Sequence, residues 1–511
     1  MDPKRACRKA AVSLLIVLFA GLTGFAQGEI DRCIEIELQR VERLYDLLDR
    51  FAGQVWPGWD NYMDIEFEAI FPNRVRMIVN PRGVLPEDYK VIEGMTVRGK
   101  KIFLNRKNEI PLSMKPPLGR GGNARGRVVI NLEVMDKAPA PGAFHRDNAV
   151  ALREFQSDVQ LLTYVHEMFH EYQSKAWPVR AAQMKAYERS REKQAPQQKS
   201  APAKPRLKPK SEMPLIFYVP LHYAVYKEIE GRALLSAYRE QDDRGAVEYL
   251  KDAFVAGEMR RKGMEETDVA REMRLAAGEG TAQYAQVKMA RLIRDAGYRP
   301  PHESGADPYF FNFRFMDEVV RYETGPVIED WMRKTQDSRG FQYLFGMLQG
   351  FLLDRFAPDW KPGFFENNRT FDDLIAGFLR LDESEKEKIE ARLKTKYPYE
   401  EISARHAQTI TARDDALSLI ESRKGKTFIV DWTATNVLFP EIVPRGTWWQ
   451  VDHRNIYPHG VEKIAFGEVE LVGRDMPMEK TWIYYFEWVD TAAKEGSKGY
   501  TLTSRNQEGS I

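Results

Sequence analysis

Residues 166–170 have the sequence His-Glu-Met-Phe-His, and this HExxH motif restricts the fold of the chain more than any other feature. Its two histidines are four positions apart, about one helical turn, so on a helix both project from the same face. Two neutral imidazoles at that spacing bind one divalent metal ion, most often zinc. Glu167 follows the first histidine and is expected to act as general base on a metal-bound water.

The residues around the motif predict a buried helix. Apolar side chains recur at helical spacing in two stripes, namely Phe155, Val159, Leu162 and Phe169, and Leu161, Val165 and Met168. A helix that is apolar on most sides is buried. Burying two imidazoles and a carboxylate is costly unless something satisfies them, and a metal ion would do so.

A third metal ligand has to come from elsewhere in the chain. A catalytic zinc site needs three protein ligands and one open position, and His170 is not followed by the Gly and His of a longer HExxHxxGxxH motif. Two glutamates are candidates, Glu279 and Glu230. Each is followed by Gly, with Ala two positions after that Gly. We expect these small residues to let the ligand helix approach the HExxH helix closely.

The HExxH motif followed by Glu279-Gly280, Ala282 and Tyr284 resembles the gluzincin zinc metallopeptidases, whose third ligand is a glutamate in a similar Glu-Gly-x-Ala helix. The resemblance spans roughly residues 150–290. It implies a zincin-like fold, Zn²⁺ held by His166, His170 and Glu279, and hydrolysis of a peptide or protein substrate with Glu167 as base. The interval from His170 to Glu279 is longer than in the familiar members, which leaves Glu230 as the alternative ligand.

Other side chains are candidates for supporting roles. A tyrosine or histidine is expected to help zinc stabilise the oxyanion, and the candidates are Tyr322, Tyr284 and His302. Carboxylates are expected to orient the ligand imidazoles, and the candidates are Glu171, Glu272 and Asp158.

The N-terminus has the pattern of a secretory signal. Basic residues at positions 4–9 precede an apolar run over 10–20, and small residues at Gly24 and Ala26 predict cleavage after Ala26. Only Cys33 would remain after cleavage, so no internal disulfide is expected. We therefore predict an exported protein of a bacterial periplasm or exterior, with no transmembrane segment after cleavage. A net charge of +1 gives no indication of nucleic-acid binding.

The sequence predicts an α+β protein in several parts. After the signal peptide at 1–26, residues 27–147 are expected to form a helix and a small β-sheet, with strands near 67–71, 75–79, 101–104 and 127–134. Residues 148–420 are predicted to be the helical zincin-like region, interrupted by a disordered basic insertion at 188–214. Residues 425–511 are predicted to form a small antiparallel β domain.

Three functions are compatible with these patterns. The first is an exported zinc-dependent peptidase, and a related one is a metal hydrolase that acts on a non-peptide amide or ester. The alternative is a non-catalytic secreted or envelope protein that serves binding or scaffolding, with a structural metal or none. Glu167 favours the enzyme, because a structural site needs no base.

Overall fold

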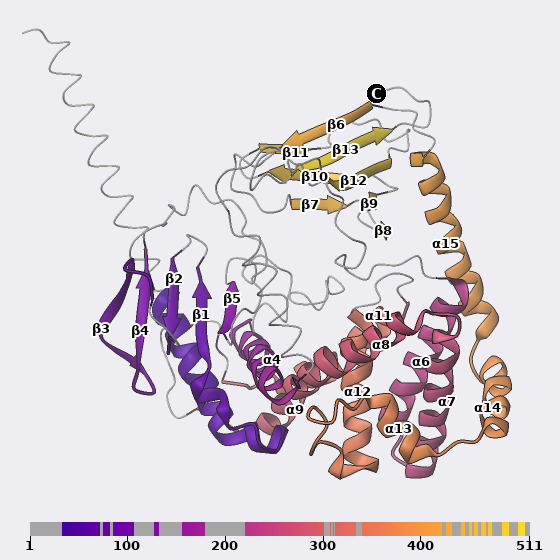
Figure 1. The fold of residues 1–511 in the computed structure, drawn as a ribbon, viewed down its shortest axis with the longest axis horizontal. Coiled ribbons are helices and arrows are strands. Elements are labelled where there is room, and N and C mark those ends of the chain that lie inside the picture. Colours follow the sequence, from indigo (N-terminus) through magenta and orange to yellow (C-terminus); the bar gives the residue numbers. More distant parts are fainter. Residues whose placement is uncertain are drawn as a thin grey trace, which may run out of the picture.

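An N-terminal sheet and a large helical region make up most of the described chain (Figure 1). The computed structural model describes residues 33–71, 75–81, 85–106, 127–131, 156–178, 220–300, 307, 310, 312–333 and 340–421, and a series of strands between 426 and 505. These elements form an α+β fold, which confirms the α+β part of the predicted fold class. The signal at 1–26 and the insertion at 188–214 lie outside the described residues.

The N-terminal sheet has the strand order β3-β4-β2-β1-β5. Strands β1 (Glu66–Ile70), β2 (Arg76–Val79), β4 (Lys100–Asn105) and β3 (Tyr89–Val97) pair antiparallel. Strand β5 (Arg127–Asn131) pairs with β1 in parallel, in the register Phe67 to Val128. The longest of these strands, β3, was not predicted, because most of its residues are exposed or half-buried and their pattern lacks a buried face.

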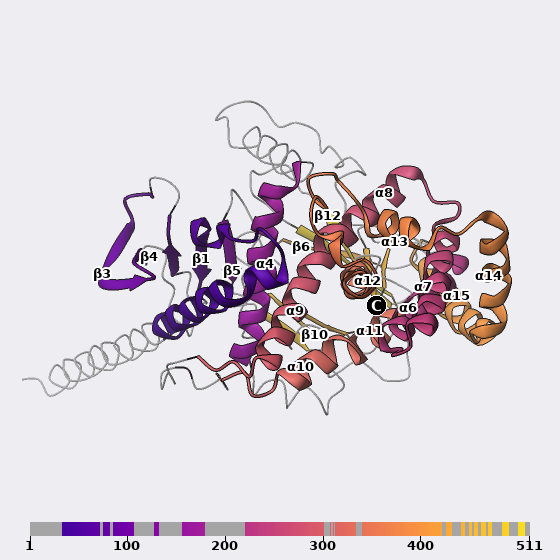
Figure 2. The same cartoon turned by 90° about the horizontal axis from the view of Figure 1, so that it is seen from below.

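Helix α4 (Gln156–Ala176) carries the HExxH motif and lies between the sheet and the other helices. It contacts β5 on one side and α9 (Thr281–Asp295) on the other, as Figures 1 and 2 both show. The predicted buried helix is therefore present. It is the element through which the sheet and the helical region meet.

An aromatic cluster packs around Phe169 of α4. The Phe169 ring lies 5.3 Å from that of Trp56 and 5.0 Å from that of Trp59, between the centroids. Trp56 in turn stacks on Phe365 at 5.0 Å and meets Trp360 edge-on at 5.0 Å. Because Phe169 is fully buried in this cluster, the rotation of α4 about its axis is fixed, and with it the directions in which the two histidines project.

Polar contacts also tie α4 to the N-terminal helix, which covers residues 33–55. Tyr164 donates to Glu37 Oε1 at 2.6 Å, and Arg40 Nη2 donates to Ser157 Oγ at 2.8 Å. Arg40 Nε also reaches Asp307 at 3.3 Å. All these polar groups are buried, so the network satisfies them at the start of α4.

The helical region continues after the 179–219 interval. Its elements are α6 (Leu221–Arg239), α7 (Asp243–Arg261), α8 (Glu266–Leu275), η4 (Ala276–Gly280), α9, α10 (Met316–Glu323), α11 (Pro326–Arg333), α12 (Gly340–Phe356), α13 (Phe371–Leu379), α14 (Glu383–Lys396) and α15 (Tyr399–Glu421). Helices α6 and α7 pack side by side, and α12 packs against α9 (Figure 2). None of the described helices combines the length and the hydrophobicity needed to cross a membrane.

Strands follow α15. They are β6 (Lys426–Asp431), β7 (Glu441–Pro444), β8 (Trp449–Val451), β9 (Arg454–Tyr457), β10 (Val461–Phe466), β11 (Val469–Val472), β12 (Ile483–Val489) and β13 (Gly499–Arg505). They pair antiparallel in two sheets, β11-β10-β7 and β6-β13-β12-β9-β8. Strands are thus present in the region for which the sequence predicts them.

Candidate metal centre

The two histidines of the motif lie beside Glu279 in the folded chain. His170 Nε2 is 3.0 Å and His166 Nε2 is 3.5 Å from the same oxygen, Oε2 of Glu279. Ligand atoms about 2.1 Å from a tetrahedral zinc ion are separated by roughly 3.4 Å. The three side chains, called the HHE trio below, therefore have the chemistry and the spacing of a three-ligand site.

The HHE trio is largely buried but not sealed. The side chains of His166 and His170 are 9% and 5% exposed, whereas that of Glu279 is 21% exposed. Glu167 is half-buried. Of the three ligand side chains, the carboxylate of Glu279 is therefore the most exposed.

Gln173 determines how the His170 ring presents its nitrogens. The Gln173 amide nitrogen donates to Gly278 O at 2.7 Å and to Thr281 Oγ1 at 2.6 Å, so the amide oxygen is left facing His170 Nδ1 at 2.8 Å. Only a protonated Nδ1 makes a hydrogen bond with that oxygen. In the neutral ring, Nε2 therefore carries the lone pair and faces Glu279 as a ligand nitrogen would.

The space between His170 Nε2 and the Glu279 carboxylate favours a positive charge. A lone pair and a carboxylate repel each other at 3.0 Å unless a proton or a metal ion lies between them. Burial alone would raise the pKa of Glu279, but electrostatic attraction to the neighbouring His170 and His166 rings and hydrogen bonds from them hold that pKa well below its usual range. The residues present thus fit a divalent cation, which would replace the ring protons.

Glu279 lies in a π-helical turn, η4, between α8 and α9. Thr281 Oγ1 donates to Ala277 O at 2.6 Å and accepts from Gln173, which links this turn to α4. Single π-helical turns within longer helices are frequent at functional sites. The sequence pattern did not predict this turn, because no local motif distinguishes it from a regular helix.

Gly280 serves a different purpose from the one expected. A Cβ at this position would lie 2.6 Å from Gly346 Cα of α12. The glycine therefore allows η4 to approach α12, and not the HExxH helix as predicted. Gly231 likewise faces side chains of α11 and α12, since a Cβ there would meet Met332 and Phe345.

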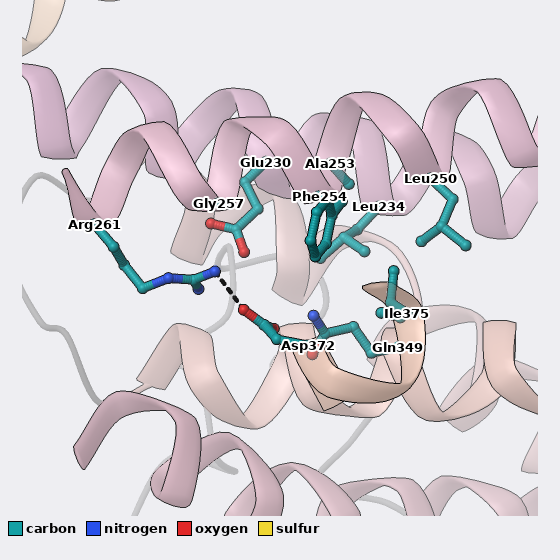
Figure 3. Close-up of a pocket in the computed structure, with 10 residues that line it drawn as sticks. All are labelled: Glu230, Leu234, Leu250, Ala253, Phe254, Gly257, Arg261, Gln349, Asp372 and Ile375. Carbon is teal, nitrogen blue, oxygen red and sulfur yellow. Dashed lines mark hydrogen bonds and ion pairs between the residues drawn. The ribbon is translucent and has the colours of Figure 1, made fainter. Parts of the chain in front are cut away.

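Glu230, the alternative third ligand, lies elsewhere. Its Oε2 accepts from the buried Arg260 Nε at 2.6 Å. Glu230 also lines a small pocket between α6, α7, α12 and α13, beside the ion pair between Arg261 and Asp372 (Figure 3). No member of the HHE trio lines this pocket. The geometry thus favours Glu279, since Glu230 is already neutralised by an arginine.

Two of the three carboxylates expected to orient the imidazoles, Glu272 and Asp158, contact other groups, while the prediction for Glu171, which is buried on α4, stays a prediction. Glu272 accepts from Arg260 Nη1 at 2.5 Å and from Tyr223. Asp158 accepts from the Phe313 backbone N–H at 3.4 Å. The group that orients the His170 ring is instead the side-chain amide of Gln173, which was not predicted because only carboxylates were expected in this role.

A tyrosine that was not among the predicted candidates, Tyr343 of α12, lies beside the HHE trio. Its ring is parallel to that of His166, at an interplanar angle of 8° and a centroid distance of 6.0 Å. Tyr284 points away and donates to Asp354 Oδ2 at 2.7 Å. Tyr322 is half-buried on α10, and His302 lies outside the described residues.

Comparison of the chain with protein-family models, with curated proteins and with solved structures gave no match. The chemistry of the HHE trio is therefore inferred from its own geometry.

Proposed function

We propose that the chain is an exported zinc-dependent metallohydrolase with a zincin-like catalytic region, acting on peptide or protein substrates. One observation carries the proposal: both HExxH imidazoles face one oxygen of Glu279, at 3.0 and 3.5 Å. His166, His170 and Glu279 would hold the ion. Bound zinc would acidify a water molecule and polarise the carbonyl under attack.

Glu167 is the residue that gives the site a hydrolytic role. It is adjacent to His166 on α4 and remains half-buried, outside the HHE trio. A carboxylate at this position accepts the proton of an attacking water and passes it to the leaving amine. Tyr343, whose ring lies over His166, is proposed to donate a hydrogen bond to the oxyanion.

Strand β5 suggests how an extended substrate would lie. It is at the edge of the described N-terminal sheet, with β1 on its inner side, and it contacts α4. An extended peptide can add to such an edge as a further strand. This placement supports a peptide as the substrate over a compact small molecule.

Metal analysis together with one substitution tests the proposal. The purified protein should contain about one zinc ion per chain, removable with a chelator. Glu167→Gln should retain zinc and lose turnover of a quenched peptide library by roughly 10²–10⁴-fold. Glu387→Gln, an exposed glutamate on α14, is the matched control and should behave like the unsubstituted protein.

Two results would contradict the proposal. A folded protein that binds no divalent metal ion would rule out the metal centre. Full activity of Glu167→Gln would exclude Glu167 as the general base. Zinc binding without any hydrolysis would instead favour a secreted binding protein with a structural metal.

A further inference from the structure

Glu323 is a carboxylate near the HHE trio that the proposed hydrolysis does not use. It ends α10, which packs against α9. Arg294 Nε, late in α9, is 3.7 Å from Asp317 at the start of α10, whereas Gln283 Nε2, early in α9, donates to Glu323 Oε2 at 3.1 Å. The two helices therefore run antiparallel, and Glu323 lies at the end of α9 that adjoins Glu279.

Gln283 links Glu323 to the HHE trio in space. It follows Glu279 by four residues, and the intervening Gly280 and Thr281 keep right-handed helical backbone angles. Residues four apart on a helix are separated by about 6 Å along its axis. Because Gln283 donates to Glu323, the Glu323 carboxyl group lies beside the helical turn that follows Glu279.

The charge of Glu323 has no partner among the described residues. Its described polar contact is the neutral amide of Gln283, and the described part of the chain supplies no arginine or lysine to it. Burial raises the pKa of Glu323 to about 7. The side chain nevertheless keeps partial contact with solvent. A desolvated but reachable carboxylate without a counterion is unfavourable for stability and typical of a binding site.

We propose that Glu323 binds a cationic group of the substrate and gives the site a preference for basic peptides. The ligand class is a lysine ammonium or an arginine guanidinium, which forms a charge-assisted hydrogen bond with a carboxylate. A lysine side chain carries its ammonium group at the end of a flexible four-carbon stem, so it can extend from a peptide bound at the HHE trio toward Glu323. This proposal rests on the proposed function, because it assigns the substrate class of the same site.

A binding experiment tests Glu323 without requiring catalysis. The probes are N-acetyl-lysine methylamide and its neutral analogue N-acetyl-norleucine methylamide, titrated calorimetrically at pH 8 into zinc-loaded and zinc-stripped protein. We expect the lysine probe to bind at least about tenfold more tightly. Glu323→Gln should reduce this preference to about twofold or less, and Glu318→Gln, an exposed glutamate on the same helix, should retain it.

The outcomes separate this proposal from the metallohydrolase itself. Equal affinity for both probes, no binding of either probe, or an undiminished preference in Glu323→Gln overturns the cation site, even if peptides are cleaved. A preference that depends on Glu323 supports the cation site, even if the protein proves to hold no zinc. Where peptides are cleaved, kcat/KM for matched lysine and norleucine peptides should show the same Glu323-dependent ratio.

Discussion

Gln173 Oε1 lies 2.8 Å from His170 Nδ1 and fixes which nitrogen of that ring faces Glu279. The same amide is anchored to Gly278 and Thr281 of the neighbouring element. The orientation of one histidine is therefore coupled to the position of the third member of the HHE trio.

Replacing Gln173 with Met should weaken zinc binding by about 10–100-fold, because the ring loses the acceptor that holds its tautomer and orientation. Competition with a chromophoric chelator measures the change. Ser174→Ala is the control, since Ser174 donates to the His170 backbone carbonyl and not to the ring. Unchanged zinc affinity in Gln173→Met would show that the ring is held by other contacts.

Tyr343→Phe should retain zinc and lower kcat by about 10²–10³-fold with little change in KM, because it removes only a hydroxyl that acts on the oxyanion. Peptide hydrolysis and metal content measured on the same sample check this. Tyr249→Phe, on α7, should leave both unchanged. A normal kcat for Tyr343→Phe would leave its ring with a packing role against His166.

Gly280→Ala should lower the free energy of unfolding by about 1–3 kcal/mol or more, because its Cβ would lie 2.6 Å from Gly346 Cα. Gly377→Ala provides the contrast, since its Cβ would meet nothing within 4 Å in the interior of α13. That substitution should stabilise the protein by about 0.5–1 kcal/mol. Denaturant unfolding measures both, and similar values for the two would contradict the close approach of η4 and α12.

Because of Glu323, the free energy of unfolding should fall as the pH rises. Burial raises its pKa in the folded state from 4.5 to about 7, so the folded state binds the extra proton between these values. Stability is then lost progressively as pH increases from about 4.5 to 7 and is constant above. Glu323→Gln should therefore stabilise the protein by about 1–2 kcal/mol at pH 8, allowing for partial exposure, and by little at pH 5.

Unfolding free energies measured at both pH values check this dependence. Glu318→Gln, whose side chain is exposed, should show no such difference between the two conditions. A stabilisation by Glu323→Gln that is equal at pH 5 and pH 8 would show that charge is not its origin.

The HExxH helix was predictable from sequence because the pattern that identifies it lies within a single short segment. The four-residue spacing and the apolar stripes are properties of one helix, and α4 has the buried face they imply. The strands β1, β2, β4 and β5 likewise follow from alternation and from the turns between them. The exposed hairpin strand β3 has no buried face and therefore no such signal.

The choice between Glu279 and Glu230 depended on distant contacts. Both have a following Gly and Ala, but only the fold places Arg260 beside Glu230 and the histidines beside Glu279. Gln173 and Tyr343 were missed for a similar reason. An amide and a tyrosine have no spacing rule, and Tyr343 approaches His166 only because α12 packs on η4.

The π-helical turn at Ala276–Gly280 directs the third ligand, Glu279, toward the two histidine rings. One residue in a regular α-helix corresponds to a rotation of about 100°. Deleting one of the residues before Glu279 in this turn would leave both sequence motifs intact, but it would rotate the Glu279 side chain away from the histidines. Related chains that differ there by one deletion would thus keep the signature and lose the site, so the length of this segment is as diagnostic as the motifs themselves.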